Sequence, residues 1–325
     1  MTQPKPFQPL TIDATAFDPA RAPADALAVN AAIVKALEHW DLWSQPLPVM
    51  RQLRREGKGA FPAPVYSPRA RTLTIEGRGG PIDLRVIAPD RPRGVYLHIH
   101  GGGWAVGAAD FHDAWLERHA DRAGMACVSV EYRLAPEHPY PAGPDDCEDA
   151  ALWLAAKAQE LFGTDRLVIG GESAGAHLSV VTLLRLRDRH GLSPFRGANL
   201  NAGCYDLALT PSARSFGQTK LVLTTRDITM FVRHFLVHGG NVADPDISPI
   251  HADLKGLPPA LFSVGTLDAL VDDSLFMATR WAAAGNEAIL DLYPAGCHVF
   301  AGFPGSNTDR CLERIDAFMQ RVTAD

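Results

Sequence analysis

Short apolar runs alternate with amphipathic helical segments from residue 71 to residue 321. The runs expected to be strands are 71–76, 82–88, 95–99, 126–132, 167–170, 198–203, 260–265 and 288–293. Helical periodicity lies between them at 111–123, 144–159, 174–189, 273–284 and 308–321. The first two runs flank Gly79-Gly80, which indicates a hairpin. The later alternation predicts βαβ units, and therefore an α/β fold with a mostly parallel sheet.

Two segments fall outside this alternation and have no strand pattern. In the first, residues 23–40 and 47–55 show helical periodicity. In the second, residues 207–240, an aromatic stretch at 227–237 is expected to be helical. The expected organisation is an N-terminal helical segment 1–60, an α/β domain 61–325 and an inserted helical segment 207–240. A length of 325 residues alone would suggest two domains, but it also permits one large α/β domain with such attachments.

Charge and composition exclude several kinds of partner. With 31 basic and 37 acidic side chains the net charge is −6, which offers no basic surface for nucleic acid or anionic lipid. The five cysteines form no CxxC pair, so we expect free thiols in a reducing compartment rather than disulfides or a zinc ribbon. No run of about 18 apolar residues occurs, and MTQPKPFQPL has no apolar run that could serve as a signal peptide. We expect a cytoplasmic protein without a membrane span.

The segment RLVIGGESAGAHL contains the pattern GxSxG, with Ser173 at its centre. An apolar strand is expected to enter the pattern and a helix to leave it, which would place Ser173 on a strained turn with its hydroxyl exposed. Gly171 and Gly175 suit positions where a side chain would collide with neighbouring backbone. A plain glycine-rich turn between a strand and a helix is the alternative. The context favours a catalytic nucleophile at the start of a helix, where developing negative charge is stabilised.

The strand expected at 95–99 runs directly into the sequence HGGGW. Consecutive glycines leave backbone N–H groups approachable, as the oxyanion of acyl transfer requires. The N–H of Ala174, directly after the nucleophile, would be a further donor. A phosphate-binding loop is disfavoured because no GxGxxG, GKS or GKT pattern follows. His98 and His100 could form a metal pair, but no third ligand is evident, so we expect no metal and a structural role for His100.

A serine hydroxyl needs a base, usually an imidazole that a carboxylate orients. In an α/β-hydrolase the acid and then the base follow the serine in the chain, each on a loop at the carboxyl end of a strand. Asp268 lies in such a loop. Asp272 and Asp273 are the alternatives, but they suit the cap and first turn of the next helix. His298, the last histidine of the chain, follows the last expected strand and is the candidate base.

Together these motifs resemble those of the hormone-sensitive lipase family of esterases, which have the α/β-hydrolase fold. The matching residues are HGGGW at 100–104, EYRLAPEHPYPA at 131–142, GESAG at 171–175, DALVD at 268–272, and His298. The resemblance covers roughly residues 70–322. It implies a mostly parallel eight-stranded sheet flanked by helices. It also implies that the two outlying segments form a helical cap over the site.

At the matching positions the resemblance implies a catalytic triad and an oxyanion hole. The implied triad is Ser173 as nucleophile, Asp268 as acid and His298 as base. The implied oxyanion donors are the N–H groups of Gly102, Gly103 and Ala174. Enzymes of this family hydrolyse small-molecule esters with short or medium acyl chains and need no cofactor. The departures from the family's common pattern are Glu172 for Asp, Ala269 for Pro and Val299 for Gly, and each could reshape the pocket.

The sequence constrains the substrate pocket less. The candidate pocket residues are Trp104, Tyr205, Phe216, Phe231, Phe235 and Val299. Aromatic residues at helical spacing belong more often to a core, and the choice between a monomer and a homodimer stays open. The alternative activity is that of an amidase, such as an arylformamidase, with the same triad. The alternative class is a binding protein on an inactive hydrolase scaffold, which the complete triad disfavours.

Overall fold

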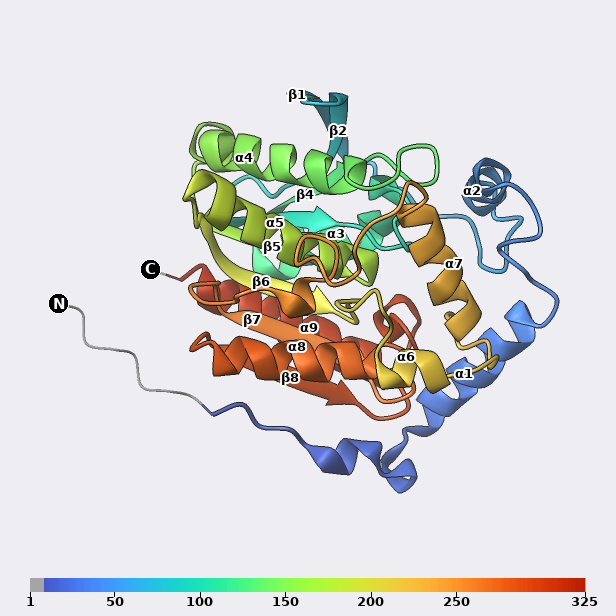
Figure 1. Cartoon of the computed structure of the whole chain (residues 1–325). Coiled ribbons are helices and arrows are strands. Elements are labelled where there is room, and N and C mark those ends of the chain that lie inside the picture. Colours follow the sequence, from blue (N-terminus) through green and yellow to red (C-terminus); the bar gives the residue numbers. More distant parts are fainter. Residues whose placement is uncertain (1–8, 325) are drawn as a thin grey trace.

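The strands form one sheet at the centre of the molecule (Figure 1). In the computed structural model, which describes residues 9–324, the eight strands lie in the order β1-β2-β4-β3-β5-β6-β7-β8. Their bounds are β1 Arg71–Gly77, β2 Gly80–Ile87, β3 Gly94–Ile99, β4 Met125–Glu131, β5 Leu167–Glu172, β6 Phe195–Asn201, β7 Ala260–Gly265 and β8 Ala288–Tyr293. Strand β2 pairs antiparallel with β1 and with β4, and all other pairs are parallel. The predicted α/β fold with a mostly parallel sheet is confirmed.

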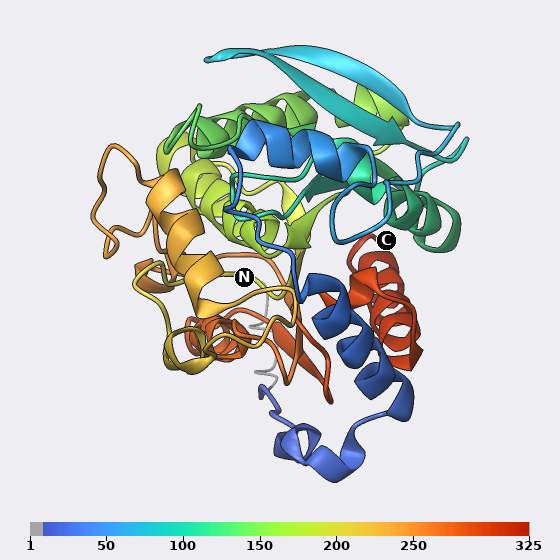
Figure 2. The same cartoon turned by 90° about the vertical axis from the view of Figure 1, so that its right-hand side faces the viewer.

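Helices cover both faces of the sheet (Figures 1 and 2). Their bounds are α1 Ala24–Leu37, α2 Leu47–Arg55, α3 Asp113–Ala123, α4 Ala142–Phe162, α5 Ala174–His190, α6 Pro211–Ser215, α7 Thr225–Phe235, α8 Val271–Ala283 and α9 Ser306–Val322. Along β3, Leu97 packs in the apolar cluster that contains α4, α5 and α8, whereas Tyr96 packs with α3 and α9. The core therefore lies on both faces, as is usual for parallel sheets. None of the helices within residues 9–324 has the length and apolarity that crossing a membrane requires.

Most of these elements begin and end within three residues of their predicted bounds. The runs at 260–265 and 288–293 match β7 and β8. The run at 198–203 differs, because β6 ends at Asn201. The next residue, Ala202, has a φ of 47°, which turns the chain out of the sheet. Helices α3, α4 and α5 each end at a glycine in the left-handed conformation, which is a common helix terminator.

The two segments outside the alternation lie side by side. Figure 2 shows α1 and α2 in blue and α7 in orange around one region. Between α1 and α2, the ring of Trp43 packs edge-on against Phe231 of α7, with 4.9 Å between ring centroids, and its Nε1 donates to Asp227 over 2.8 Å. Arg226 and Asp41 form an ion pair of 2.9 Å across the same contact. The division of the chain into a cap and a catalytic domain stays a prediction, but these contacts make the two segments neighbours.

Candidate active site

The candidate nucleophile lies on a sharp turn between β5 and α5. β5 ends at Glu172, α5 begins at Ala174, and Ser173 between them has a φ of 55° and a ψ of −120°. This backbone conformation is costly for a residue with a side chain and persists only where the surroundings hold it. A side chain at Gly171 or Gly175 would collide with the carbonyl oxygen of Ile99, because β3 passes directly beside the turn. The two glycines of the motif therefore allow the turn to pack against the sheet.

The three residues of the expected triad meet at this turn. Nε2 of His298 lies 3.0 Å from Oγ of Ser173, and Nδ1 of His298 lies 3.0 Å from each carboxylate oxygen of Asp268. Asp268, in the loop after β7, also accepts a hydrogen bond of 2.8 Å from the N–H of Leu270. His298 and Asp268 are buried. The geometry is therefore that of a serine, a base and an acid in hydrogen-bond contact.

The two alternative acids lie elsewhere. Asp273, in the first turn of α8, accepts hydrogen bonds from the N–H groups of Tyr205 and Asp206 and from the hydroxyl of Thr210. Burial raises the pKa of Asp273 to about 7, although these hydrogen bonds lower it. Asp272 accepts a hydrogen bond from the N–H of Ser212. These two carboxylates hold the chain after β6 against α8, and neither contacts the imidazole of the candidate base.

The glycine loop lies opposite the nucleophile, at the end of β3. Gly102 and Gly103 have φ values of 114° and 57°, and both line the same cavity as Ser173 and Ala174. A side chain at Gly103 would collide with the ring of Phe231, so this position needs glycine for space as well as for conformation. Their N–H groups are the backbone donors expected to bind an oxyanion beside the serine.

His100 packs behind this loop. Its Nδ1 lies 2.8 Å from the carbonyl oxygen of Gly101, and its ring stacks on Tyr132 with 4.2 Å between centroids. The hydroxyl of Tyr132 donates to the carbonyl oxygen of His100 over 2.9 Å. Burial lowers the pKa of His100 to about 3, so the ring is neutral at neutral pH. These contacts brace the start of the loop from the side away from the cavity.

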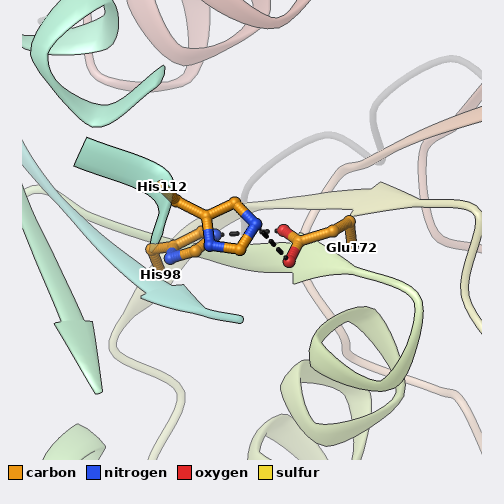
Figure 3. A group of neighbouring side chains, drawn as sticks. All are labelled: His98, His112 and Glu172. Atoms are coloured by element: carbon orange, nitrogen blue, oxygen red, sulfur yellow. Dashed lines mark hydrogen bonds and ion pairs between the residues drawn. The ribbon is translucent and has the colours of Figure 1, made fainter. Parts of the chain in front are cut away.

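Glu172, directly before the nucleophile, is a buried carboxylate with two histidine partners (Figure 3) and one backbone partner. Its Oε2 lies 3.1 Å from Nε2 of His98, and its Oε1 lies 3.1 Å from Nε2 of His112. The N–H of Gly101 donates to the same Oε1. Glu172 thus ties the first glycine of the loop to the nucleophile turn.

The two histidines also set the charge of this carboxylate. Burial alone would raise the pKa of Glu172, but the charges and hydrogen bonds of His112 and His98 hold it well below its ordinary value. Burial likewise acts to lower the pKa of His112, but the negative charge of Glu172 raises it above its ordinary value. Burial lowers the pKa of His98. Glu172 is therefore charged at neutral pH, and its negative charge favours the protonated form of His112.

The same three side chains could also hold a metal ion, since one ligand atom from each lies within 4.8 Å of the others. Two imidazoles and a carboxylate suit zinc or iron. The ligand pair considered from sequence, His98 with His100, is not the one that the fold brings together. His98 lies instead beside His112, which comes from the short 3-10 helix Ala109–His112. No sequence motif around His112 indicates this contact. In the structure the imidazoles bond the carboxylate itself.

The candidate pocket is a cavity of about 400 Å³ beside Ser173 and His298. The predicted pocket residues that line it are Trp104, Phe231 and Val299. The predicted pocket residues that do not line it are Tyr205, Phe216 and Phe235. Phe235 stacks on Trp104 at 4.7 Å and forms a layer behind the lining. Tyr205 is fully buried, and Phe216 packs against the apolar core. Helical spacing could not separate lining residues from this second layer.

Acyl transfer is the chemistry that such a cavity supports, because a serine hydroxyl, an oriented imidazole and backbone N–H donors face one space. The fold and the site together define a serine hydrolase of the α/β-hydrolase class.

Comparison with known proteins agrees with this class. The chain matches the family described as "alpha/beta hydrolase fold" over residues 96–302. It is 34% identical over 279 residues to the carboxylic ester hydrolase LipN of Mycobacterium tuberculosis, covering 81% of this chain and 74% of that protein. It is 36% identical over 232 residues to the carboxylesterase NlhH of the same organism, covering 68% of this chain and 72% of that protein.

Solved structures show the same relationship. The structure of a hyperthermophilic esterase from Pyrobaculum calidifontis superimposes with a TM-score of 0.81 at 28% identity, covering 98% of this chain and all of that one. A hormone-sensitive lipase from a metagenome library gives a TM-score of 0.81 at 26% identity, covering 93% of this chain and 100% of that one. The chain belongs to the α/β-hydrolase fold family, and within it to the hormone-sensitive lipase family of esterases. The resemblance inferred from the motifs is confirmed.

Proposed function

We propose that this carboxylic ester hydrolase acts through Ser173, His298 and Asp268. The distances of 3.0 Å that link Ser173 Oγ to His298 Nε2, and His298 Nδ1 to Asp268, are the observation that supports these roles most directly. Ser173 attacks the ester carbonyl while Nε2 of His298 takes the hydroxyl proton. Asp268 accepts the Nδ1–H of the imidazole, fixes its tautomer and stabilises the imidazolium that forms.

The negative charge of the tetrahedral intermediate develops on the former carbonyl oxygen. We assign its stabilisation to the N–H groups of Gly102, Gly103 and Ala174, all of which belong to residues that line the cavity. The start of α5 adds a favourable partial positive charge at the same place. His298 then gives its proton to the leaving alcohol, and an acyl-enzyme remains on Ser173. A water molecule, activated by His298, releases the acid and restores the serine.

The helical segments 1–60 and 207–240 are proposed to form the cap over this site. Both contribute to the cavity wall: Leu42 and Met50 come from the first segment, and Phe231 comes from the second. The cavity volume of about 400 Å³ lies at the small end of the range of ligand pockets, which is roughly 300–1,000 Å³. This size and the apolar wall support esters with short to medium acyl chains as substrates.

A series of p-nitrophenyl esters of increasing acyl length tests the function. The proposal predicts hydrolysis that is greatest for short to medium chains, and loss of hydrolysis in Ser173→Ala with the thermal unfolding curve unchanged. Full activity of Ser173→Ala would contradict the role of Ser173. An aryl ester compared with an N-formyl aromatic amine distinguishes the esterase from an amidase, because only an amidase would process the amide faster.

We also propose a cytoplasmic location. The five cysteines are free thiols and are all buried, which supports a location in a reducing compartment such as the cytoplasm. Fractionation of the producing cells tests this location: recovery of the activity outside the cytoplasm would contradict it.

A further inference from the structure

The cavity wall contains Arg54, which has no counter-ion in the part of the chain that the structure describes. Helix α2 ends in a basic run in which Arg51 forms an ion pair of 2.7 Å with Glu137, and Arg55 forms one of 2.9 Å with Asp110. Arg54 lines the cavity of Ser173, but its guanidinium donates to the carbonyl oxygen of Pro62. Within residues 9–324, Arg54 forms no ion pair with a carboxylate, in contrast to Arg51 and Arg55.

The other charges on the cavity wall are already engaged. Glu172 is bonded by two histidines and a backbone N–H, as described above. Asp41 pairs with Arg226 over 2.9 Å. Asp227 caps α7 through the hydroxyl and N–H of Thr224. The carboxylates of the wall therefore have partners of their own and do not neutralise Arg54.

Lys220, another cation of the wall, differs from Arg54 in its bonding. Nζ of Lys220 donates to the carbonyl oxygens of Leu37 and Trp40, over 3.0 and 2.7 Å. These two bonds hold Lys220 against the end of α1. Two of the three N–H groups of its ammonium are therefore structural donors, whereas the guanidinium of Arg54 has five N–H groups and donates one of them to Pro62.

Arg54 has lost part of its hydration. Burial lowers the pKa of Arg54, as expected for a cation that has given up water without gaining an anion. Its guanidinium carbon lies 5.3 Å from the centroid of the Phe111 ring, which orients the planar group. A planar guanidinium of this kind binds a carboxylate through two parallel hydrogen bonds, and such bonds are strongest where water is partly excluded.

We propose that the natural ester carries a carboxylate apart from its scissile bond, and that Arg54 binds this carboxylate at the cavity wall. Candidate substrates are half-esters of dicarboxylic acids and esters of hydroxy acids. The inference rests on the proposed function, because it names the substrate class of the same site. Arg54 is a specificity residue in this account, and the chemistry stays with Ser173.

The experiment compares kcat/KM within two matched pairs of esters. In the first pair, mono-p-nitrophenyl glutarate carries a carboxylate on its acyl side and p-nitrophenyl butyrate is the neutral ester. In the second pair, 4-acetoxybenzoate carries a carboxylate on its alcohol side and its methyl ester is the neutral compound. We expect Arg54→Gln to lower the ratio of charged to neutral ester about 10- to 100-fold in at least one pair, mainly through KM, as loss of a charge-assisted hydrogen bond would. Arg54→Lys keeps the positive charge but loses the planar group that forms two parallel hydrogen bonds, and should give an intermediate ratio.

Arg55→Gln is the matched control. Arg55 lies on the same helix, 5.0 Å from the centroid of the same Phe111 ring, but it pairs with Asp110 and does not line the cavity. Its substitution should leave the ratio unchanged. Added salt should lower the ratio in the wild type and not in Arg54→Gln.

Two different failures can be told apart. If the wild type hydrolyses neither the charged nor the neutral ester of either pair, the proposed function is wrong. If it hydrolyses neutral esters and the ratio is the same in wild type, Arg54→Gln and Arg54→Lys for both pairs, the anionic substrate is wrong and the esterase proposal is untouched. A fall of the ratio in Arg55→Gln as large as in Arg54→Gln also overturns the assignment. Thermal unfolding curves show which variants are folded at the assay temperature.

Discussion

Replacing Glu172 by glutamine removes one charge between the nucleophile turn and the glycine loop, and it keeps the size of the side chain. A glutamine has one acceptor oxygen, and its NH2 group must face His98, His112 or Gly101 where a carboxylate oxygen now accepts. If the amide oxygen stays on the N–H of Gly101, the NH2 group faces an imidazole nitrogen that must then accept. For His98 this changes the tautomer and therefore its contact of 2.8 Å with the hydroxyl of Ser129.

The expected effect on stability and rate follows from these contacts. A broken buried ion pair costs about 3–5 kcal/mol, so we expect Glu172→Gln to lower the free energy of unfolding by about 3 kcal/mol. Gly101 directly precedes Gly102 and Gly103, the proposed oxyanion donors. Complete loss of one such donor lowers kcat about 100- to 1,000-fold, so a displaced loop should lower kcat about 10- to 100-fold with little change in KM.

The pH dependence of stability should change as well. The raised pKa of His112 gives stability that is complete below its ordinary pKa of 6.5 and is lost as pH rises through the raised value. The depressed pKa of Glu172 gives stability that is complete above its ordinary pKa of 4.5 and is lost as pH falls. The pair therefore stabilises the fold most between these two values. In Glu172→Gln this maximum should flatten.

Steady-state hydrolysis of p-nitrophenyl butyrate and denaturant unfolding at several pH values measure these effects. The control is Glu131→Gln, since Glu131 is partly buried and, like Glu172, accepts a backbone hydrogen bond, here of 2.7 Å from Ala109 outside the glycine loop. Its kcat should stay at the wild-type value. If Glu172→Gln keeps both the wild-type kcat and the wild-type unfolding free energy, the carboxylate does not hold the loop and the reasoning fails.

Three further substitutions test other contacts. Gly171→Ala should destabilise the fold and abolish activity, since its Cβ would collide with the carbonyl of Ile99, and normal activity would contradict the packing of the turn. For Asp273, whose pKa of about 7 lies above the ordinary 3.8, stability is complete below about pH 4 and is lost as pH rises to 7, by up to about 4 kcal/mol. Asp273→Asn should remove this fall in unfolding experiments, and an unchanged slope would contradict it. Arg185→Ala should cost about 3 kcal/mol or more in urea unfolding, because Asp246, bonded at 2.6 and 2.7 Å, loses its buried partner; a loss below about 1 kcal/mol would argue against it.

The sequence predicts the fold and the positions of the triad residues more completely than it predicts the pocket. The runs at 260–265 and 288–293 are apolar and closely bounded by Pro or Gly, so they predict β7 and β8 at their observed limits. Because the loops after these strands meet at one edge of the sheet, Asp268 and His298 could be named beside Ser173 before any contact was known. Their catalytic roles stay a prediction.

Contacts that arise only when distant segments pack together leave no comparable signal in the sequence. His112 reaches Glu172 from a short 3-10 helix, and Arg54 reaches the cavity from α2, and neither position is marked by a motif or a periodic pattern. The sequence also does not show whether an aromatic ring lines the cavity or packs behind its wall. Phe231 lines the cavity, whereas Phe235, one turn further along α7, lies behind Trp104. Helical spacing gives the face of a helix but not the layer in which a ring ends.

The central claim is that Ser173 becomes acylated during ester hydrolysis. Rapid acid quenching of the enzyme during turnover of p-nitrophenyl butyrate, followed by mass spectrometry of its peptides, tests this directly. The account predicts that one butyryl group is found on the peptide that contains Ser173, and that no acyl group is found in Ser173→Ala. A butyryl group on another residue, or the same turnover without any acylated peptide in the wild type, would contradict it.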